Sequence, residues 1–152
     1  MFDYPDRSEG VAARRPFLAD LREDEVATIV SYAQHRRYAD GEAAVHRDDR
    51  DRSVFIVLSG VFEVRVDGRR QAEVGPGGIF GELSWFDAAP RSADVVAAGV
   101  AEALMVTPAT FDRLRLNEPR LAVLFLMDLA RLVTGRLRDE IRRSDRRDAD
   151  RT

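Results

Sequence analysis

The sequence predicts a mainly β fold with flanking helices: an antiparallel β-barrel or jelly roll of about eight strands, a short N-terminal helical segment and two C-terminal helices. Three observations lead to this prediction. Apolar and charged residues alternate between Phe62 and Asp67, glycines punctuate the middle of the chain, and two proline-containing helix starts follow the last short strand. At 152 residues the chain is long enough for one domain with its own hydrophobic core.

The first predicted element is a short helix. Leu21 is followed by acidic residues at 23–25, which favour the first turn of a helix because of its dipole. Apolar residues then recur at helical spacing, namely Val26, Ile29, Val30 and Ala33. This pattern predicts a helix that begins close to Leu21.

Short strands are expected after Asp40-Gly41. Between Phe62 and Val66 apolar side chains alternate with charged ones, which is typical of a half-buried strand. Ser59-Gly60 predicts a turn, and Asp67-Gly68 predicts the turn of a β-hairpin. Further strands are expected at residues 53–58, 71–74, 94–98 and 101–106. Evenly spaced strands of this kind favour a small antiparallel barrel.

Two helices are predicted to follow the strands. Thr107-Pro108 offers a hydroxyl cap with proline at the first helical position, and Asn117-Glu118-Pro119 repeats this signal for a longer helix. From Leu121 to Leu137 the longer helix is apolar on more than one face, which predicts burial on two sides or a partner. We expect it to form a lid, the seam of a homodimer or a contact for an effector protein. Asp128 interrupts a clean heptad pattern.

Composition narrows the class of protein. Every basic residue is Arg, and the net charge of -3 gives no reason to expect nucleic acid as a partner. The absence of cysteine permits a cytoplasmic location, and the acidic N-terminus does not fit a signal peptide. The longest apolar run, Leu121 to Ala130, is much shorter than the about 20 residues of a membrane span. We therefore expect a cytoplasmic protein with a flexible N-terminus at 1–15, one folded domain at 16–143 and a charged tail at 144–152.

The segment from Phe80 to Ala93 carries the chemistry. It places a carboxylate, Glu82, and a guanidinium, Arg91, nine residues apart. The planar fork of Arg can meet two phosphate oxygens, and a carboxylate can accept a hydrogen bond from a sugar hydroxyl. Gly81 would let a ligand approach the backbone, and a helix that begins at Glu82 would direct free N–H groups at an anion. This layout predicts a nucleotide pocket.

With the segments around it, this loop resembles the phosphate-binding cassette of the cyclic nucleotide-binding domain family. That family includes the regulatory subunits of protein kinase A, cyclic-nucleotide-gated channels and the catabolite activator protein. Asp40-Gly41-Glu42 and the stretch from Val54 to Gly60 resemble the early strands of the family. The resemblance extends from Phe17 to about Asp139 and implies a barrel bracketed by helices.

The resemblance implies a role for each position of the cassette. Glu82 matches the acid that accepts a hydrogen bond from the ribose 2′-hydroxyl, and Arg91 matches the guanidinium that pairs with the cyclic phosphate. Val64 and Ala72 match barrel positions beneath the base. Thr at the position of Ser92 often favours cGMP in the family, so Ser92 favours cAMP. The remaining cassette positions are Phe80, Gly81, Leu83, Ser84 and Ala93.

Two features depart from the family pattern. The loop from Arg47 to Arg52 has no glycine, and we expect this to have only a small effect on the pocket. The residue that caps the purine in relatives has no single match here. The candidates are Leu129, Leu132 and Arg136.

These observations predict a stand-alone cyclic nucleotide sensor rather than an enzyme. It would bind cAMP, or cGMP less well, and relay binding through its C-terminal helices to a partner protein or a second subunit. The alternative is a barrel without a ligand that acts as an interaction or dimerisation module. We expect neither a metal nor a catalytic cofactor, because His35 and His46 do not form the His-x-His pair of a cupin metal site. A DNA-binding regulator is disfavoured because no recognition helix is expected after the last helix.

Overall fold

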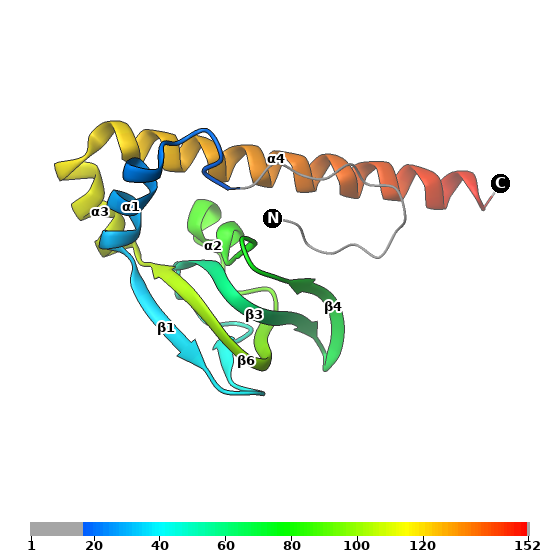
Figure 1. Cartoon of the computed structure of the whole chain (residues 1–152). Helices are drawn as coiled ribbons and strands as arrows, with labels where there is room; N and C mark the ends of the chain where they lie inside the picture. Colours follow the sequence, from blue (N-terminus) through cyan, green and yellow to red (C-terminus); the bar gives the residue numbers. More distant parts are fainter. Residues whose placement is uncertain (1–16, 152) are drawn as a thin grey trace.

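The computed structural model describes residues 17–151, so the predicted flexible N-terminus at 1–15 lies outside the described residues. Figure 1 shows a strongly bent sheet with α1, α3 and α4 at one end, and α4 runs on past the sheet. The helices are α1 (Glu23–Tyr32), α2 (Glu82–Asp87), α3 (Pro108–Asn117) and α4 (Pro119–Ala149). The strands are β1 (Gln34–Tyr38), β2 (Ala43–Val45), β3 (Val54–Val66), β4 (Arg69–Val74), β5 (Ile79–Phe80) and β6 (Asp94–Val106).

The predicted antiparallel strands and flanking helices are confirmed, but the sheet has six strands rather than about eight and does not close into a barrel. The strand order is β1-β6-β3-β4, with β2 also paired to β6 and β5 also paired to β3. All of these pairings are antiparallel. Within the described residues β1 and β4 do not pair with each other, so the sheet remains open.

Two glycines explain the lower strand count. β3 and β6 are each 13 residues long and pass through the places where turns were expected. Gly60 and Gly99 have φ of 74° and 82°, which bends each strand without ending it. A Cβ at Gly60 would lie 2.5 Å from the carbonyl oxygen of Val100, so only glycine allows the two long strands to cross this closely. Each predicted pair of short strands is therefore one long bent strand.

The predicted hairpin turn and helix starts are confirmed. Asp67 and Gly68 join β3 to β4 and both have positive φ, as a two-residue type I′ turn requires. α3 begins at Pro108, and the hydroxyl of Thr107 accepts a hydrogen bond from the Thr110 N–H. α4 begins at Pro119, directly after α3.

Side chains of β3 alternate between two hydrophobic cores. Val54 and Ile56 face the helices, whereas Phe55 and Val57 face the inside of the bent sheet. The helix-side core also contains Phe17, Ile29, Ile79, Phe111, Leu114, Leu121, Phe125 and Leu129. The sheet core also contains Tyr38, Val45, Phe62, Val74, Phe80, Val95, Ala97, Ala101 and Ala103. Because β3 is covered on both faces, its first half is a continuous apolar run.

Asp128 anchors α4 rather than breaking its apolar pattern. Its buried carboxylate accepts a hydrogen bond from the backbone N–H of Leu18, which ties the helix to the turn before α1. The opposite face of α4 carries an exposed stripe at alternating steps of four and three residues. We call this set the α4 stripe: Val123, Met127, Ala130, Thr134, Leu137 and Ile141. The heptad pattern is therefore uninterrupted on the exposed face.

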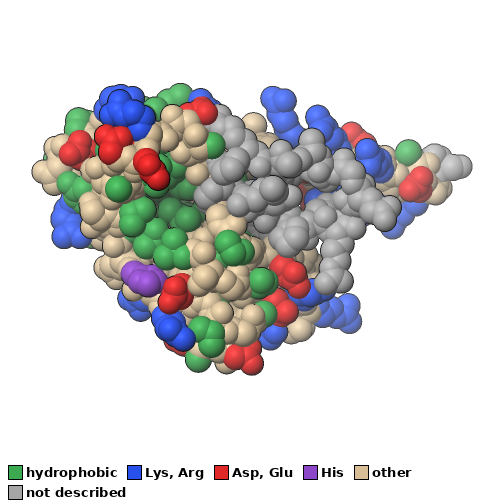
Figure 2. Space-filling model, in the orientation of Figure 1, with side chains coloured by type: hydrophobic (Ala, Val, Ile, Leu, Met, Phe, Trp, Pro, Cys, Tyr) green, Lys and Arg blue, Asp and Glu red, His purple; other side chains and the backbone are tan. Residues whose placement is uncertain are grey.

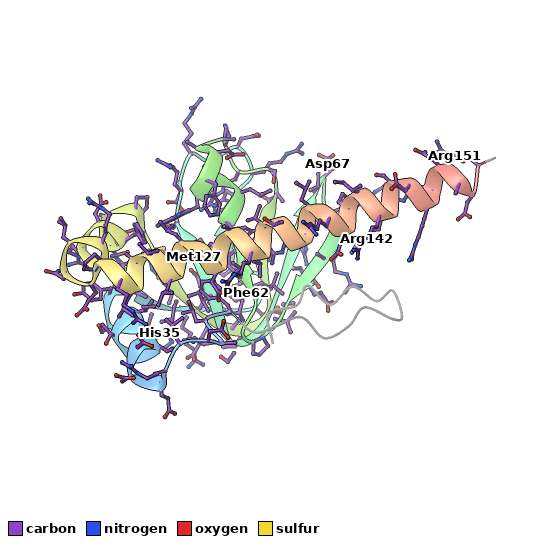
Figure 3. All side chains as sticks on the ribbon, turned by 90° about the horizontal axis from the view of Figure 1, so that it is seen from above. His35, Phe62, Asp67, Met127, Arg142 and Arg151 are labelled. Atoms are coloured by element: carbon purple, nitrogen blue, oxygen red, sulfur yellow. The ribbon has the colours of Figure 1, made fainter. Side chains whose placement is uncertain are left out.

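The end of α4 extends beyond the sheet (Figure 1). The helix is 31 residues long and continues to Ala149, whereas a charged tail was expected from residue 144. Residues 140–151 are all exposed, and Figure 2 shows both Arg and acidic side chains on this part. Seen from above, Arg151 lies well beyond Asp67 at the hairpin turn (Figure 3). No helix among residues 17–151 combines the length and the hydropathy that crossing a membrane requires.

Candidate functional site

The site is built where β5 turns into α2. β5 pairs with β3, and the rings of Phe80 and Phe55 stack with their centroids 4.7 Å apart. Gly81 then turns the chain with φ of 86°, so that α2 begins at the buried Glu82. A Cβ at Gly81 would lie 2.7 Å from the carbonyl oxygen of Ser53 and 2.8 Å from Nη1 of Arg91. Only glycine therefore fits both the backbone angle and the space.

Arg91 is buried and held from three sides. Its Nη1 donates to the carbonyl oxygen of Gly81 (2.9 Å), and its Nη2 donates to the carbonyl oxygen of Ser53 (2.6 Å) and to Oδ2 of Asp51 (3.0 Å). The side chain is only 3% exposed, yet its Nε has no hydrogen-bond partner among the described residues. The guanidinium is therefore fixed in place while the N–H group of its Nε has no acceptor among these residues.

The loop between β2 and β3 supports Arg91 through both backbone and side chains. The Arg91 N–H donates to the carbonyl oxygen of Asp49 (2.7 Å), and the Asp48 N–H donates to the carbonyl oxygen of Arg91 (2.8 Å). Partial burial raises the pKa of Asp51, but hydrogen bonds from Ser53 and Arg91 outweigh this effect, so the pKa lies below its ordinary value. Asp51 is thus a charged partner of Arg91 at neutral pH. The loop therefore supports the site directly, while the small effect expected from its missing glycine stays a prediction.

Glu82 is held by the C-terminal helix. Arg136 on α4 forms an ion pair with Glu82 through Nη1 and donates from Nη2 to the carbonyl oxygen of Ile79 (3.0 Å). Arg136 is one of the three residues considered as caps for a purine, and in the structure it contacts the carboxylate of Glu82. Leu129 is fully buried in the helix-side core, and Leu132 packs against that core.

A small cleft of about 70 Å³ lies between these groups. Every predicted site residue lines it except Ala72, which lies on β4 directly opposite Val64. Val45 and Val95, which sequence reasoning missed, form part of the apolar wall and pair with each other across β2 and β6. The full lining is Val45, Val64, Phe80, Gly81, Glu82, Leu83, Ser84, Arg91, Ser92, Ala93 and Val95. The cleft thus combines a cation, a carboxylate and hydroxyls with an apolar wall.

Asp51 and Arg52 were not recognised as parts of the site, and Arg136 was considered only as a cap for the purine, not as a partner of Glu82. Residues 47–52 are all Arg or Asp, so the sequence does not indicate which of these side chains face the site and which face solvent. Arg136 lies 54 residues from Glu82, so only the tertiary structure brings the two together.

The two histidines lie apart from this site. His35 is on β1 with its Nε2 3.6 Å from a carboxylate oxygen of Glu102, and His46 is exposed directly after β2. Residues 17–151 contain no cluster of three or more His, Cys, Asp or Glu side chains arranged to hold a metal ion.

Comparison with known proteins gives relatives that include a cyclic AMP receptor protein and a glutaminase. The chain is 33% identical over 129 residues to the cyclic AMP receptor protein of Thermus thermophilus, covering 82% of this chain and 58% of that protein. It is 32% identical over 136 residues to glutaminase 2 of Bradyrhizobium diazoefficiens, covering 88% of this chain but 22% of that enzyme. The chain therefore spans only part of the length of either relative.

Structural comparison agrees with the sequence comparison. The crystal structure of the Thermus thermophilus catabolite activator protein superposes with a TM-score of 0.74 at 29% identity, covering 86% of this chain and 62% of that one. Residues 35–118, from β1 to the start of α4, match the cyclic nucleotide-binding domain. On these matches the chain belongs to the cyclic nucleotide-binding domain family.

Proposed function

We propose that this chain is a cyclic nucleotide sensor that binds cAMP in preference to cGMP. The observation that carries the proposal is the unpaired, buried Nε of Arg91, a residue that lines the same cleft as Glu82. An unsatisfied buried donor costs about 1–3 kcal/mol, and this cost disappears if a phosphate oxygen accepts the hydrogen bond.

In this proposal each residue of the cleft binds one part of the nucleotide. Arg91 binds the cyclic phosphate together with backbone N–H groups at the start of α2, which has no side-chain cap at Gly81. Glu82 accepts a hydrogen bond from the ribose 2′-hydroxyl, and the apolar wall around Val64 lies beneath the base. The preference for cAMP rests on Ser92 and on the Thermus thermophilus relative, whose name is that of a cyclic AMP receptor.

The proposed signal leaves the cleft through two contacts of α2. Glu82 is paired with Arg136 on α4, so a ribose that engages Glu82 shares this carboxylate with α4. Trp85 on the same short helix packs edge-on against Phe111 of α3, with ring centroids 5.2 Å apart, and against Phe125 of α4, at 6.3 Å. The nucleotide can shift α3 and α4 only if it binds one arrangement of these helices better than another. No catalytic residue and no cofactor beyond the nucleotide is assigned.

The α4 stripe is the proposed exit for the signal. Its steps of four and three residues match the seam of a two-stranded coiled coil, and a second copy of the chain would present the same stripe about a two-fold axis. We therefore propose a homodimer, with a separate effector protein as the other outcome. A cytoplasmic location and the absence of nucleic-acid binding stay predictions.

Calorimetric titration tests the proposal. Wild-type protein should release or absorb heat with cAMP and bind cGMP more weakly. Loss of a buried charge partner costs about 2–5 kcal/mol, so Arg91→Ala should weaken cAMP binding roughly tenfold to several thousandfold. Arg50→Ala is the matched control, because it removes an exposed Arg of the same loop between β2 and β3. Absence of heat with both nucleotides at high micromolar concentration, or equal binding by Arg91→Ala, would contradict the proposal.

The α4 stripe also supports a second candidate function, a ligand-free interaction module. In that case the melting temperature would not respond to cAMP or cGMP, while light scattering would give the mass of a stable dimer. A nucleotide-dependent rise in melting temperature would exclude this candidate.

A further inference from the structure

The segment from Asp51 to Ser53 contacts both halves of the cassette. Its two outer residues hold Arg91, through the carboxylate of Asp51 and the carbonyl oxygen of Ser53. The side chain between them, Arg52, extends to the other end of α2. There Nη2 donates to the carbonyl oxygen of Trp85 (3.0 Å), and Nε lies 3.4 Å from the carbonyl oxygen of Ser84. Three consecutive residues thus contact both Arg91 and the carboxyl end of α2.

α2 depends on such contacts because it is very short. It has six residues, fewer than an isolated helix needs to be stable in water. The last carbonyl groups of a helix have no partner within it, and here the chain turns away at Ala88, a non-glycine residue with φ of 55°. The Ala88 N–H satisfies the Ser84 carbonyl (3.1 Å), whereas the Trp85 carbonyl accepts from Arg52. A guanidinium in this position also complements the negative end of the helix dipole.

We propose that Arg52 is a positioning residue that fixes α2 relative to Arg91. Arg52 does not line the cleft, so it acts through the helix and not on the ligand. A phosphate that shifts Arg91 also shifts Asp51 and Ser53, which accept hydrogen bonds from it. Arg52 lies between these two residues in the chain, so its side chain transmits the shift to the carboxyl end of α2. The segment from Asp51 to Ser53 therefore couples the bound phosphate to the helix that presents Glu82. The role of the phosphate in this inference rests on the proposed nucleotide binding. The contact between Arg52 and α2 does not depend on that proposal.

The test compares three variants by cAMP titration. Arg52→Met keeps a side chain of similar length but removes the charge and the donors, and Arg52→Lys restores one charged donor. Arg50→Met removes the same charge from an exposed position in the same loop. Loss of one charge-assisted hydrogen bond at a half-open site predicts roughly three- to thirtyfold weaker cAMP binding for Arg52→Met. Arg52→Lys should recover part of this loss, and Arg50→Met should stay within about twofold of wild type.

Trp85 supplies a second readout at the contact itself. It is the single tryptophan of the chain, and its own carbonyl is the acceptor for Arg52. Without nucleotide and well below the melting temperature, Arg52→Met should change the acrylamide quenching of Trp85, whereas Arg50→Met should not. A role in global stability alone would lower the melting temperature of Arg52→Met and leave this quenching unchanged.

The outcomes separate the two proposals. If wild type binds neither cAMP nor cGMP, the proposed function fails while the quenching comparison still decides whether Arg52 positions α2. If wild type binds cAMP and Arg52→Met binds within about twofold with unchanged quenching, Arg52 is not a positioning residue. An equal effect of Arg50→Met on binding would also overturn the inference, because it would trace the effect to loop charge and not to the contact.

Discussion

The two charged groups of the cleft are held by different parts of the molecule. Arg91 is fixed by Gly81, Asp51 and Ser53, which all belong to the sheet and its loops. Glu82 is fixed by Arg136, which belongs to the long C-terminal helix. The Arg91 side of the cleft, which we propose as the phosphate side, is therefore complete without α4, whereas the Glu82 side, the proposed ribose side, is not. We therefore expect a ligand to affect α4 through Glu82 rather than through Arg91.

The largest effect is expected from a substitution at Gly81, which accepts a hydrogen bond from Arg91 and directly precedes Glu82. Gly81→Ala forces a left-handed backbone on a residue with a Cβ and brings that Cβ against Ser53 and Arg91. We expect cAMP binding to weaken by at least about a hundredfold, because the strain and the clash both displace Arg91. Calorimetric titration measures this loss.

Gly68→Ala is the matched control for that variant. Gly68 has φ of 73°, yet a Cβ there would meet no atom within 4 Å. We expect it to lower stability by about 1–2 kcal/mol and to leave cAMP affinity close to wild type. If both variants lose affinity equally, backbone strain alone accounts for the effect, and the close contact at Gly81 is unimportant.

The ribose side can be examined with a double-mutant cycle between Glu82→Gln and Arg136→Met. Each single change leaves a charged partner largely buried, so each should destabilise the protein, and the double variant should be more stable than the sum of the two predicts. We expect a coupling free energy of about 1–3 kcal/mol from urea unfolding without nucleotide. A coupling close to zero would mean that α4 is not held through Glu82.

The phosphate side can be examined through pH. Because the pKa of Asp51 is lower in the folded protein than in the unfolded chain, its contribution to stability is present above about pH 4 and is lost as pH falls through the folded pKa. Asp51→Asn should therefore have a lower melting temperature than wild type at pH 6, and the difference should shrink toward pH 3. A difference that is constant over this range would show that the carboxylate charge of Asp51 does not matter.

The smallest effect on the cleft is expected from the far side of α4. Leu137→Arg places a charge in the α4 stripe and should shift the mass measured by light scattering from dimer to monomer. Leu116→Arg is the control, because Leu116 is also exposed but lies on α3. Since Leu137 does not line the cleft, cAMP affinity should change by less than about threefold unless dimerisation and binding are coupled.

Local signals in the sequence predicted the structure well, and long-range ones did not. The helix starts at Pro108 and Pro119 follow from residues next to each other, as does the hairpin turn at Asp67. The strand count was wrong because a glycine that bends a strand and one that ends it look the same in a sequence. Gly60 acts as a bend only because Val100 crosses it closely.

The residues of the cleft also divide into those that local sequence predicts and those that only the tertiary structure brings together. The segment from Phe80 to Ala93 supplies most of the lining from one stretch of chain, so its residues could be predicted together. Asp51, Arg52 and Arg136 come from other elements, and only the packing of the loop and of α4 selects them from many similar charged residues.

The length of α4 has a mechanical consequence. From Arg136, where the helix is tied to the cleft, to Ala149 it continues for about 20 Å at a rise of about 1.5 Å per residue. If a ligand shifted the ion pair between Arg136 and Glu82, this part of α4 would act as a lever arm that pivots at that ion pair. A tilt of about 10° at the pivot would move the tip by about 3–4 Å. A change too small to alter the shape of the cleft would thus become large enough for a partner to detect at the end of the helix.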